Sequence, residues 1–88
     1  MDSTGRVISI VSYLAADQKK HTLTEICHHA QTSKATTYRI LSTLRLLKWV
    51  TKEERTRKYS VGPALLEVGL LALSSSDIRR VSLPFLSH

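Results

Sequence analysis

The residues best suited to binding chemistry lie in one stretch of the chain, between positions 34 and 47. Cationic and hydroxyl side chains recur along it: Lys34, Thr36, Tyr38, Arg39, Ser42, Thr43 and Arg45. These groups donate hydrogen bonds to phosphates and to the edges of bases. The stretch contains no carboxylate, although a solvated helix usually carries Glu or Asp to pair with its cations. The pattern therefore predicts a surface that binds a polyanion.

The net charge of the 88 residues is +6, and it is concentrated around that stretch. Residues 18–60 contain ten Lys or Arg against three Asp or Glu, which gives a net charge of +7. The segments on either side have net charges of −1 (residues 1–17) and zero (residues 61–88). A surface that is only solvated would usually mix the two signs. We therefore expect the middle of the chain to form the anion-binding face.

Other kinds of chemistry find little support in the sequence. Cys27, His28 and His29 are adjacent, and neighbours on a helix point about 100° apart, so they cannot converge on one metal ion. We find no nucleophile paired with a base and no phosphate-binding loop, so we expect neither an enzyme nor a bound cofactor. The single cysteine indicates a reducing compartment, and no apolar run approaches the roughly 20 residues that span a bilayer. A cytoplasmic protein without a membrane partner is expected.

Apolar residues at three- and four-residue steps predict helices in the first part of the chain. The first helix is capped by Ser3 or Thr4 and ends near residue 16. Its buried side would consist of Val7, Ile10, Val11 and Leu14, with Ile8 widening the apolar stripe. A second, short helix begins at a capping box formed by Thr22 and Glu25 and ends near residue 30. Both helices would then form part of one core.

A third helix is predicted over residues 34–47, with Ser33 as its cap. Its apolar stripe would consist of Thr37, Ile40, Leu41, Leu44 and Leu47. Two helices joined by a tight turn are typical of a helix-turn-helix, which presents its second helix outward to the major groove of DNA. The acid-free side of the third helix is the side that would face outward.

The period of the sequence changes from helical to alternating after Leu47. Residues 49–52 and 57–61 predict two strands of a hairpin, in which Tyr59 and Val61 face inward and Lys58 and Ser60 face outward. Three basic residues lie at or near its tip: Arg55, Arg57 and Lys58. Glu53 and Glu54 lower the positive charge of that tip.

A further helix is predicted from residue 64 to residue 73, and its apolar positions nearly encircle it. Such a helix needs more cover than a domain this small provides, so we expect a second chain or a further domain to cover it through Leu66, Leu70 and Leu73. The expected organisation is a winged helix-turn-helix domain at residues 1–61, a linker helix at 62–76 and the start of another domain at 77–88. The fold class is mainly α with a small β-hairpin.

Four segments follow one another along the chain: RVISI (6–10), LTEI (23–26), KATTYRIL (34–41) and YSVG (59–62). In this order and spacing they resemble the amino-terminal domain of the IclR-type transcriptional regulators. The chain departs from the family pattern at Gln31 and Thr32, where the family usually has Gly and Leu, and at Lys48, where it usually has Gly. A positive φ at Gln31 would cost about 1 kcal/mol.

The resemblance implies a DNA-binding domain joined through a helix to a carboxy-terminal effector-sensing domain that this chain lacks. It also implies a homodimer or higher homo-oligomer on a near-palindromic operator of double-stranded DNA, with a small-molecule effector that acts only through the missing domain. We expect a repressor rather than an activator. An alternative stays open, in which the winged helix binds another protein and has no specific DNA site.

Helix-turn-helix geometry assigns roles to the residues of the third helix. Lys34, Thr36 and Arg39 would read bases, with Arg39 pairing with guanine or instead clamping a phosphate, and Thr36 offering its hydroxyl or its methyl group. Contacts to the DNA backbone are expected from Arg6, Thr22, Tyr38, Ser42, Thr43 and Arg45. The wing residues Arg55, Arg57 and Lys58 would approach the minor groove.

Overall fold

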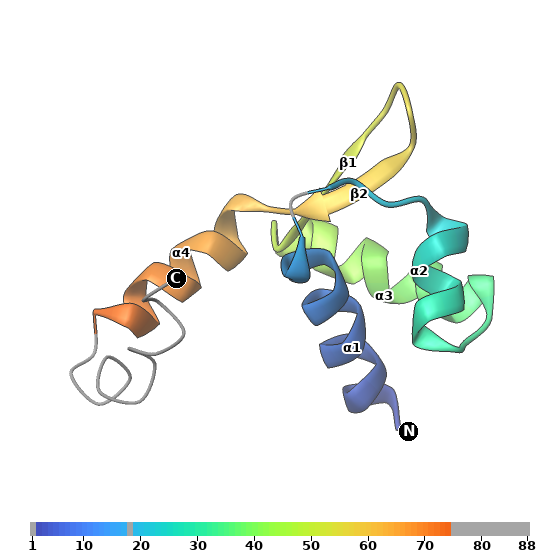
Figure 1. The fold of residues 1–88 in the computed structure, drawn as a ribbon, viewed down its shortest axis with the longest axis horizontal. Helices are drawn as coiled ribbons and strands as arrows, with labels where there is room; N and C mark the ends of the chain where they lie inside the picture. The colour runs from blue at the N-terminus through green and yellow to red at the C-terminus, as the bar shows by residue number, and fades with distance from the viewer. Residues whose placement is uncertain (1, 18, 75–88) are drawn as a thin grey trace.

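The computed structural model describes residues 2–17 and 19–74, and it has three helices followed by a two-stranded hairpin and a fourth helix. The elements are α1 (Ser3–Ala16), α2 (Leu23–Ala30), α3 (Lys34–Leu46), β1 (Val50–Glu53), β2 (Lys58–Val61) and α4 (Pro63–Leu73). In Figure 1, α1, α2 and α3 gather beneath the hairpin, whereas α4 extends away from them. The predicted fold class is confirmed. The expected start of another domain, at 77–88, lies outside the described residues.

The cap of α1 differs from the prediction. Asp2 caps the helix, and its carboxylate accepts a hydrogen bond of 2.8 Å from the amide of Gly5. The prediction of Ser3 or Thr4 as the cap was wrong. The helix begins at Ser3, which is one or two residues before the start that those caps would give. A carboxylate at this position also interacts favourably with the positive end of the helix dipole.

The caps of α2 and α3 agree with the prediction. In α2 the Thr22 hydroxyl accepts from the Glu25 amide, and the Glu25 carboxylate accepts from the Thr22 amide. In α3 the Ser33 hydroxyl accepts from the Thr36 amide at 3.1 Å. Between the two helices Gln31 has a φ of 54°, so a residue with a side chain occupies the left-handed conformation for which the family uses Gly.

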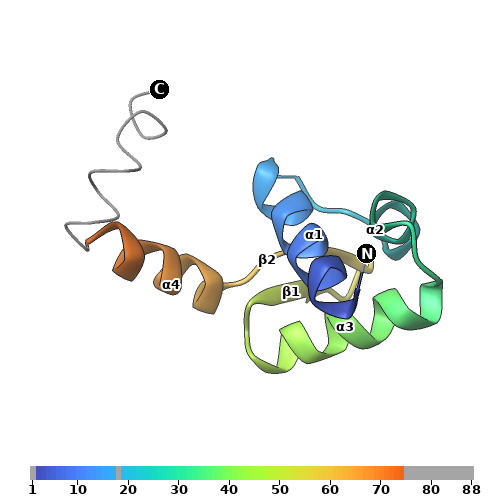
Figure 2. The same ribbon diagram turned by 90° about the horizontal axis from the view of Figure 1, so that it is seen from below.

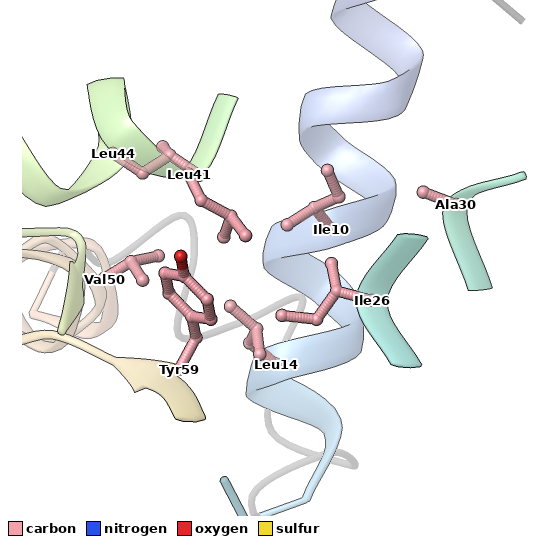
Figure 3. Close-up of a cluster of buried hydrophobic side chains, with 8 residues drawn as sticks. All are labelled: Ile10, Leu14, Ile26, Ala30, Leu41, Leu44, Val50 and Tyr59. Carbon is pink, nitrogen blue, oxygen red and sulfur yellow. The ribbon is translucent and has the colours of Figure 1, made fainter. Parts of the chain in front are cut away.

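The core lies where α1, α2 and α3 meet the hairpin (Figure 3). Its buried hydrophobic residues are Ile10, Leu14, Ile26, Ala30, Leu41, Leu44, Val50 and Tyr59. Thr37 is fully buried, as predicted, and its hydroxyl donates to the Ser33 carbonyl. The placements of Ile8 and Leu47 on the apolar stripes of their helices were wrong, because these residues are 60% and 58% exposed. α3 ends at Leu46 and the chain turns through Lys48, whose φ is 63°, so the helical stripe does not continue.

The wing is an antiparallel pair in which Val50 lies opposite Val61 and Glu53 opposite Lys58. Tyr59 is buried and Lys58 exposed, as predicted, while Ser60 is half-buried and hydrogen-bonded to the Thr51 hydroxyl. The predicted strands began one residue too early, since residues 49 and 57 lie outside them. Figure 2 shows that the wing and α1 lie on one side of α3 and leave its other side uncovered.

His21 extends the sheet in a way that the sequence did not indicate. Its amide donates to the Tyr59 carbonyl at 2.8 Å, and the Tyr59 amide donates to the His21 carbonyl at 2.7 Å. The His21 ring is buried, with Nε2 at 3.0 Å from a carboxylate oxygen of Asp17. This bridge ties the segment before α2 to the strand that leads into α4.

α4 joins the rest of the chain through its first turn. The Gly62 amide donates to the Trp49 carbonyl, and the Ala64 amide donates to the Lys48 carbonyl. A Cβ atom at Gly62 would collide with that Lys48 oxygen, so this close approach requires glycine. No residue of α4 is buried. Among the described residues, no helix has the length and apolar character needed to cross a bilayer.

Candidate nucleic-acid interface

The outward side of α3 carries the residues predicted to read bases. Lys34 and Arg39 are exposed, and Thr36 is half-buried. Within residues 2–17 and 19–74, neither Lys34 nor Arg39 forms an ion pair. Both cations are therefore available to an external anion.

The start of α3 has features that favour an anion. Its first turn contains no acidic residue, and helix geometry leaves its first amides without partners inside the helix. The Ser33 hydroxyl donates to the Thr36 hydroxyl oxygen at 3.0 Å and accepts from the Thr36 amide. The hydroxyl hydrogen of Thr36 is thus left free to donate to a ligand.

One flank of α3 borders a shallow groove against the start of α1. The groove is lined by Ser3, Val7, Thr36, Arg39, Ile40, Thr43 and Leu44. The Thr43 hydroxyl donates to the carbonyl of Arg39 at 3.2 Å, so it has only its lone pairs left for an outside partner. Arg39 and Thr36, predicted to act together, do lie beside the same groove.

The opposite flank of α3 faces the wing. Arg45 lies there, and its guanidinium is 3.4 Å from the Glu54 carboxylate. Tyr38 is 50% exposed and is not part of the core. Ser42 is half-buried. Among the described residues, Arg45 is thus the one predicted contact on α3 that has a carboxylate beside it.

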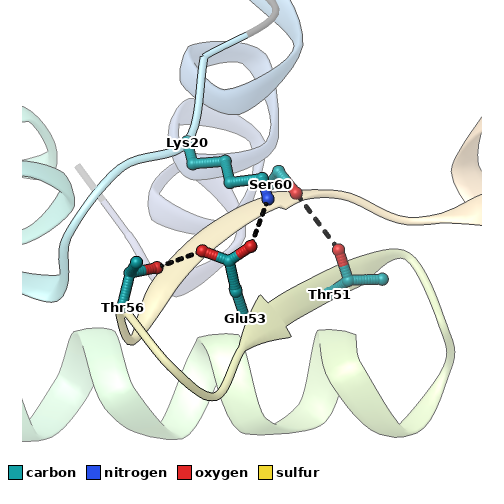
Figure 4. Close-up of polar contacts among 5 residues, drawn as sticks. All are labelled: Lys20, Thr51, Glu53, Thr56 and Ser60. Carbon is teal, nitrogen blue, oxygen red and sulfur yellow. Dashed lines mark hydrogen bonds and ion pairs between the residues drawn. The ribbon is translucent and has the colours of Figure 1, made fainter.

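Glu53 of the wing has two partners within the chain (Figure 4). Glu53 accepts from the Lys20 ammonium at 2.7 Å and from the Thr56 hydroxyl at 2.6 Å. The Lys20 hydrogen bond, followed by that of Thr56, lowers the pKa of Glu53 below its ordinary value. Lys20 was not predicted, and no sequence signal connects it with a residue 33 positions away.

The basic residues of the wing remain open to solvent. Arg55, Arg57 and Lys58 are exposed, and none of them forms an ion pair with a carboxylate in the described part of the chain. Arg57 has a φ of 60°, which belongs to the tight turn between the strands. The turn therefore presents cations while its acids are held by Lys20 and Arg45.

The two predicted backbone contacts outside α3 and the wing differ in their surroundings. Arg6 is half-buried in the first turns of α1. Thr22 lies beside the Glu25 carboxylate, whose pKa is lowered chiefly by the hydrogen bond from the Thr22 amide. A phosphate at Thr22 would meet this carboxylate, so the start of α2 is less favourable to an anion than the start of α3.

Cys27, His21 and His29 are held by contacts other than metal ligation. Within the described residues there is no group of three His, Cys, Asp or Glu side chains that could hold an ion. Tyr13 stacks on His29, with ring centroids 4.1 Å apart, and also contacts the His21 ring. The Cys27 thiol donates to the Thr32 carbonyl and so helps to fix the turn before α3.

The apolar residues predicted to contact a second chain lie on one side of α4. Leu66 and Leu70 are exposed, and Leu73 is half-buried. Together with Val11 and Ala15 of α1 they line a groove between the two helices. The structure thus brings the three predicted residues to one surface.

Comparison with known families agrees with this geometry. The model of the IclR helix-turn-helix domain matches residues 3–54, which run from the start of α1 to the wing turn. The chain belongs to this family. Its α3 is therefore the second helix of the IclR helix-turn-helix.

Individual relatives support the same assignment. The HTH-type transcriptional regulator KdgR of Escherichia coli (strain K12) is 33% identical over 81 residues, which cover 90% of this chain and 31% of the relative. KdgR of Dickeya chrysanthemi is also 33% identical over 81 residues, covering 90% of this chain and 27% of the relative. The chain thus spans less than a third of the length of these relatives.

Solved structures share the fold. An IclR transcriptional regulator from Alicyclobacillus acidocaldarius superposes with a TM-score of 0.74 at 29% identity, over 84% of this chain and 29% of that one. Pseudomonas aeruginosa HmgR gives a TM-score of 0.77 at 25% identity, over 96% of this chain and 35% of that one. The family model is that of a helix-turn-helix domain, and the relatives named above that the chain resembles include proteins described as transcriptional regulators.

Proposed function

We propose that this chain binds double-stranded DNA with sequence preference by inserting the outward side of α3 into the major groove. Lys34, Thr36 and Arg39 read bases, and the wing residues Arg55, Arg57 and Lys58 approach the adjacent minor groove. Contacts to the sugar-phosphate backbone come from Arg6, Thr22, Tyr38, Ser42, Thr43 and Arg45. The bound chain regulates transcription, and we propose repression, because a protein seated on an operator excludes other proteins from it.

The observation that carries the proposal is the distribution of paired and unpaired charge. Segment 18–60 has three carboxylates, Glu25, Glu53 and Glu54, and each is engaged by a neighbour within the chain. Lys34 and Arg39 on α3 are exposed and form no ion pair with a described carboxylate. The side of α3 that faces away from the core thus offers cationic and hydroxyl groups and no carboxylate, which suits the phosphates and base edges of a duplex.

The proposal is tested by fluorescence anisotropy with duplexes selected by this chain from a random-sequence pool. We expect selection to converge on a motif and the affinity to fall steeply between two salt concentrations. Arg39→Ala should lower the affinity for the selected duplex about 5- to 150-fold, equivalent to about 1–3 kcal/mol, and relax the preference at one base pair.

Lys19→Ala is the matched control, because it removes an exposed cation from the loop before α2. It should leave the preferred sequence unchanged. Binding that is insensitive to salt, or the absence of binding to any duplex, would contradict the proposal. Loss of a protein partner on mutation of α3, with no DNA binding by the unmodified chain, would support a protein-interaction module instead.

We propose that the functional unit is a homodimer or higher homo-oligomer that uses the groove between α1 and α4. Leu66 and Leu70 are exposed there, and the groove is also lined by the apolar residues Val11, Leu14 and Ala15 of α1 and Val61 of β2. A dimer matches two recognition helices to the two halves of a near-palindromic operator.

Sedimentation velocity tests the dimer. The double variant Leu66→Glu/Leu70→Glu should sediment as a monomer, and Glu67→Ala on the same helix should sediment like the unmodified chain. The variant should also lose affinity for a palindromic duplex while keeping its affinity for a half-site. A monomeric unmodified chain at concentrations that saturate the operator would contradict the dimer.

The remaining parts of the proposal concern the longer protein. Residues 1–61 form the DNA-binding domain, residues 62–76 a linker helix, and residues 77–88 the start of a carboxy-terminal domain that binds a small-molecule effector. Relatives about three times as long as this chain support such an arrangement. The regulator acts in the cytoplasm, where it meets DNA, and performs no catalysis of its own.

A further inference from the structure

The outward face of α3 has an apolar group at its amino-terminal end. Residues 35, 39, 42 and 46 follow one another at steps of four, three and four, so they share one side of the helix: Ala35, Arg39, Ser42 and Leu46. Ala35 and Arg39 are exposed. Ala35 is the second residue of α3 and therefore lies in the turn that a recognition helix brings nearest to base edges.

Ala35 differs from its neighbours because it has nothing to donate or accept beyond its main chain. Lys34 and Thr36 supply polar groups on either side of it, and Arg39 lies one turn further along. Among the groups that base pairs expose in the major groove, the C5 methyl of thymine is the apolar one. Contact between an alanine methyl on this face and a thymine methyl makes the free energy of binding more favourable. Contact with a polar base edge that is left unpaired makes it less favourable.

We propose that Ala35 is a specificity-determining residue that reads the methyl group of a thymine close to the base pair read by Arg39. This inference rests on the proposed insertion of α3 into the major groove. Four helical residues span about 6 Å and base pairs are about 3.4 Å apart, so the thymine lies within about two steps of the base pair contacted by Arg39.

Two other methyl-bearing residues are less suited to this contact. Thr36 is half-buried, on the flank beside α1, and its hydroxyl oxygen is held by Ser33. Leu46 is 84% exposed but lies eleven residues further along the helix, about 16 Å from Ala35, at the end remote from the recognition turn. The position and the exposure of Ala35 therefore assign the contact to it.

The test removes one methyl group at a time from the DNA. Each thymine of a duplex selected by this chain is replaced by deoxyuridine, which changes only the C5 methyl. We expect one thymine whose replacement weakens binding by the unmodified chain about fourfold, the equivalent of about 0.8 kcal/mol for one buried carbon. Ala35→Gly should weaken binding to the thymine duplex by a similar factor and should show no further loss with deoxyuridine.

Each comparison between thymine and deoxyuridine is made within one variant, so a change in helix stability caused by Ala35→Gly cancels. Thr36→Ser and Leu46→Ala are the controls, and both should keep the fourfold response to deoxyuridine. The inference is overturned if no thymine is sensitive, if Ala35→Gly stays as sensitive as the unmodified chain, or if Thr36→Ser abolishes the response. Failure of the proposed function is distinct, since the unmodified chain would then select no duplex at all.

Discussion

Helices α2 and α3 begin in nearly the same way but differ in what they offer to a ligand. Each follows a hydroxyl residue, Thr22 or Ser33, whose oxygen accepts from the amide three positions on. In α2 that third residue is Glu25, and its carboxylate binds back to the Thr22 amide. In α3 the third residue is Thr36, which leaves the positive end of the helix without an internal anion. One side chain thus distinguishes a structural helix start from one that can bind an anion.

The largest effect is expected when α3 receives the capping box of α2, because its start then also carries a carboxylate. Thr36→Glu should lower DNA affinity about 100-fold, because a carboxylate among phosphates costs several kcal/mol, while the domain stays folded. Thr36→Gln forms the same box without charge, and its affinity for DNA should be about tenfold or more above that of Thr36→Glu. Anisotropy titrations measure the affinities, and thermal melts monitor the fold. Equal losses for the two variants would show that charge at this position does not govern binding.

A substitution in the turn between the two helices should change the stability of the domain without changing its affinity for DNA. Gln31 has a φ of 54°, in the left-handed region. Gln31→Gly should raise the free energy of unfolding by about 1 kcal/mol, and Gln31→Asn by less, since Asn tolerates this region better than Gln does. Urea denaturation measures both. A loss of stability in the glycine variant would mean that the Gln31 side chain contributes more than its backbone conformation costs.

The smallest expected effect concerns the pH dependence of the α2 cap. The pKa of Glu25 is lowered by the Thr22 amide, so its stabilising contribution is present above the ordinary pKa of about 4.5 and is lost as pH falls through the lower folded-state value. Glu25→Gln should melt at a lower temperature than the unmodified chain at pH 7. Asp17 and Glu53 also have lowered pKa values and are common to both proteins, so the difference between them isolates Glu25.

That melting difference should shrink as the pH is lowered below 4. A gap that stays constant from pH 7 to pH 3 would show that the charge of Glu25 does not contribute to the cap. DNA binding at pH 7 should be no weaker in Glu25→Gln, because the substitution removes a carboxylate near the proposed interface.

The prediction from sequence succeeded where a signal involves residues within one helical turn. The Thr22–Glu25 box and the Ser33 cap were read correctly because capping joins residues three positions apart. Thr37 was placed in the core by its position on the apolar stripe. The same local reasoning failed at helix ends: Asp2 rather than Ser3 or Thr4 caps α1, and Leu47 leaves the stripe where the chain turns.

The helices, two of their three predicted caps and the acid-free side of α3 could be predicted from the amino-acid sequence, because these features depend on neighbours a few positions away. Which charges are neutralised depends on how the elements pack. Glu53 meets Lys20 and Glu54 meets Arg45 across 33 and 9 positions, and His21 pairs with Tyr59 on the far strand. Such partners are set by how the elements pack together, and that packing leaves Lys34 and Arg39 without an ion pair among the described residues.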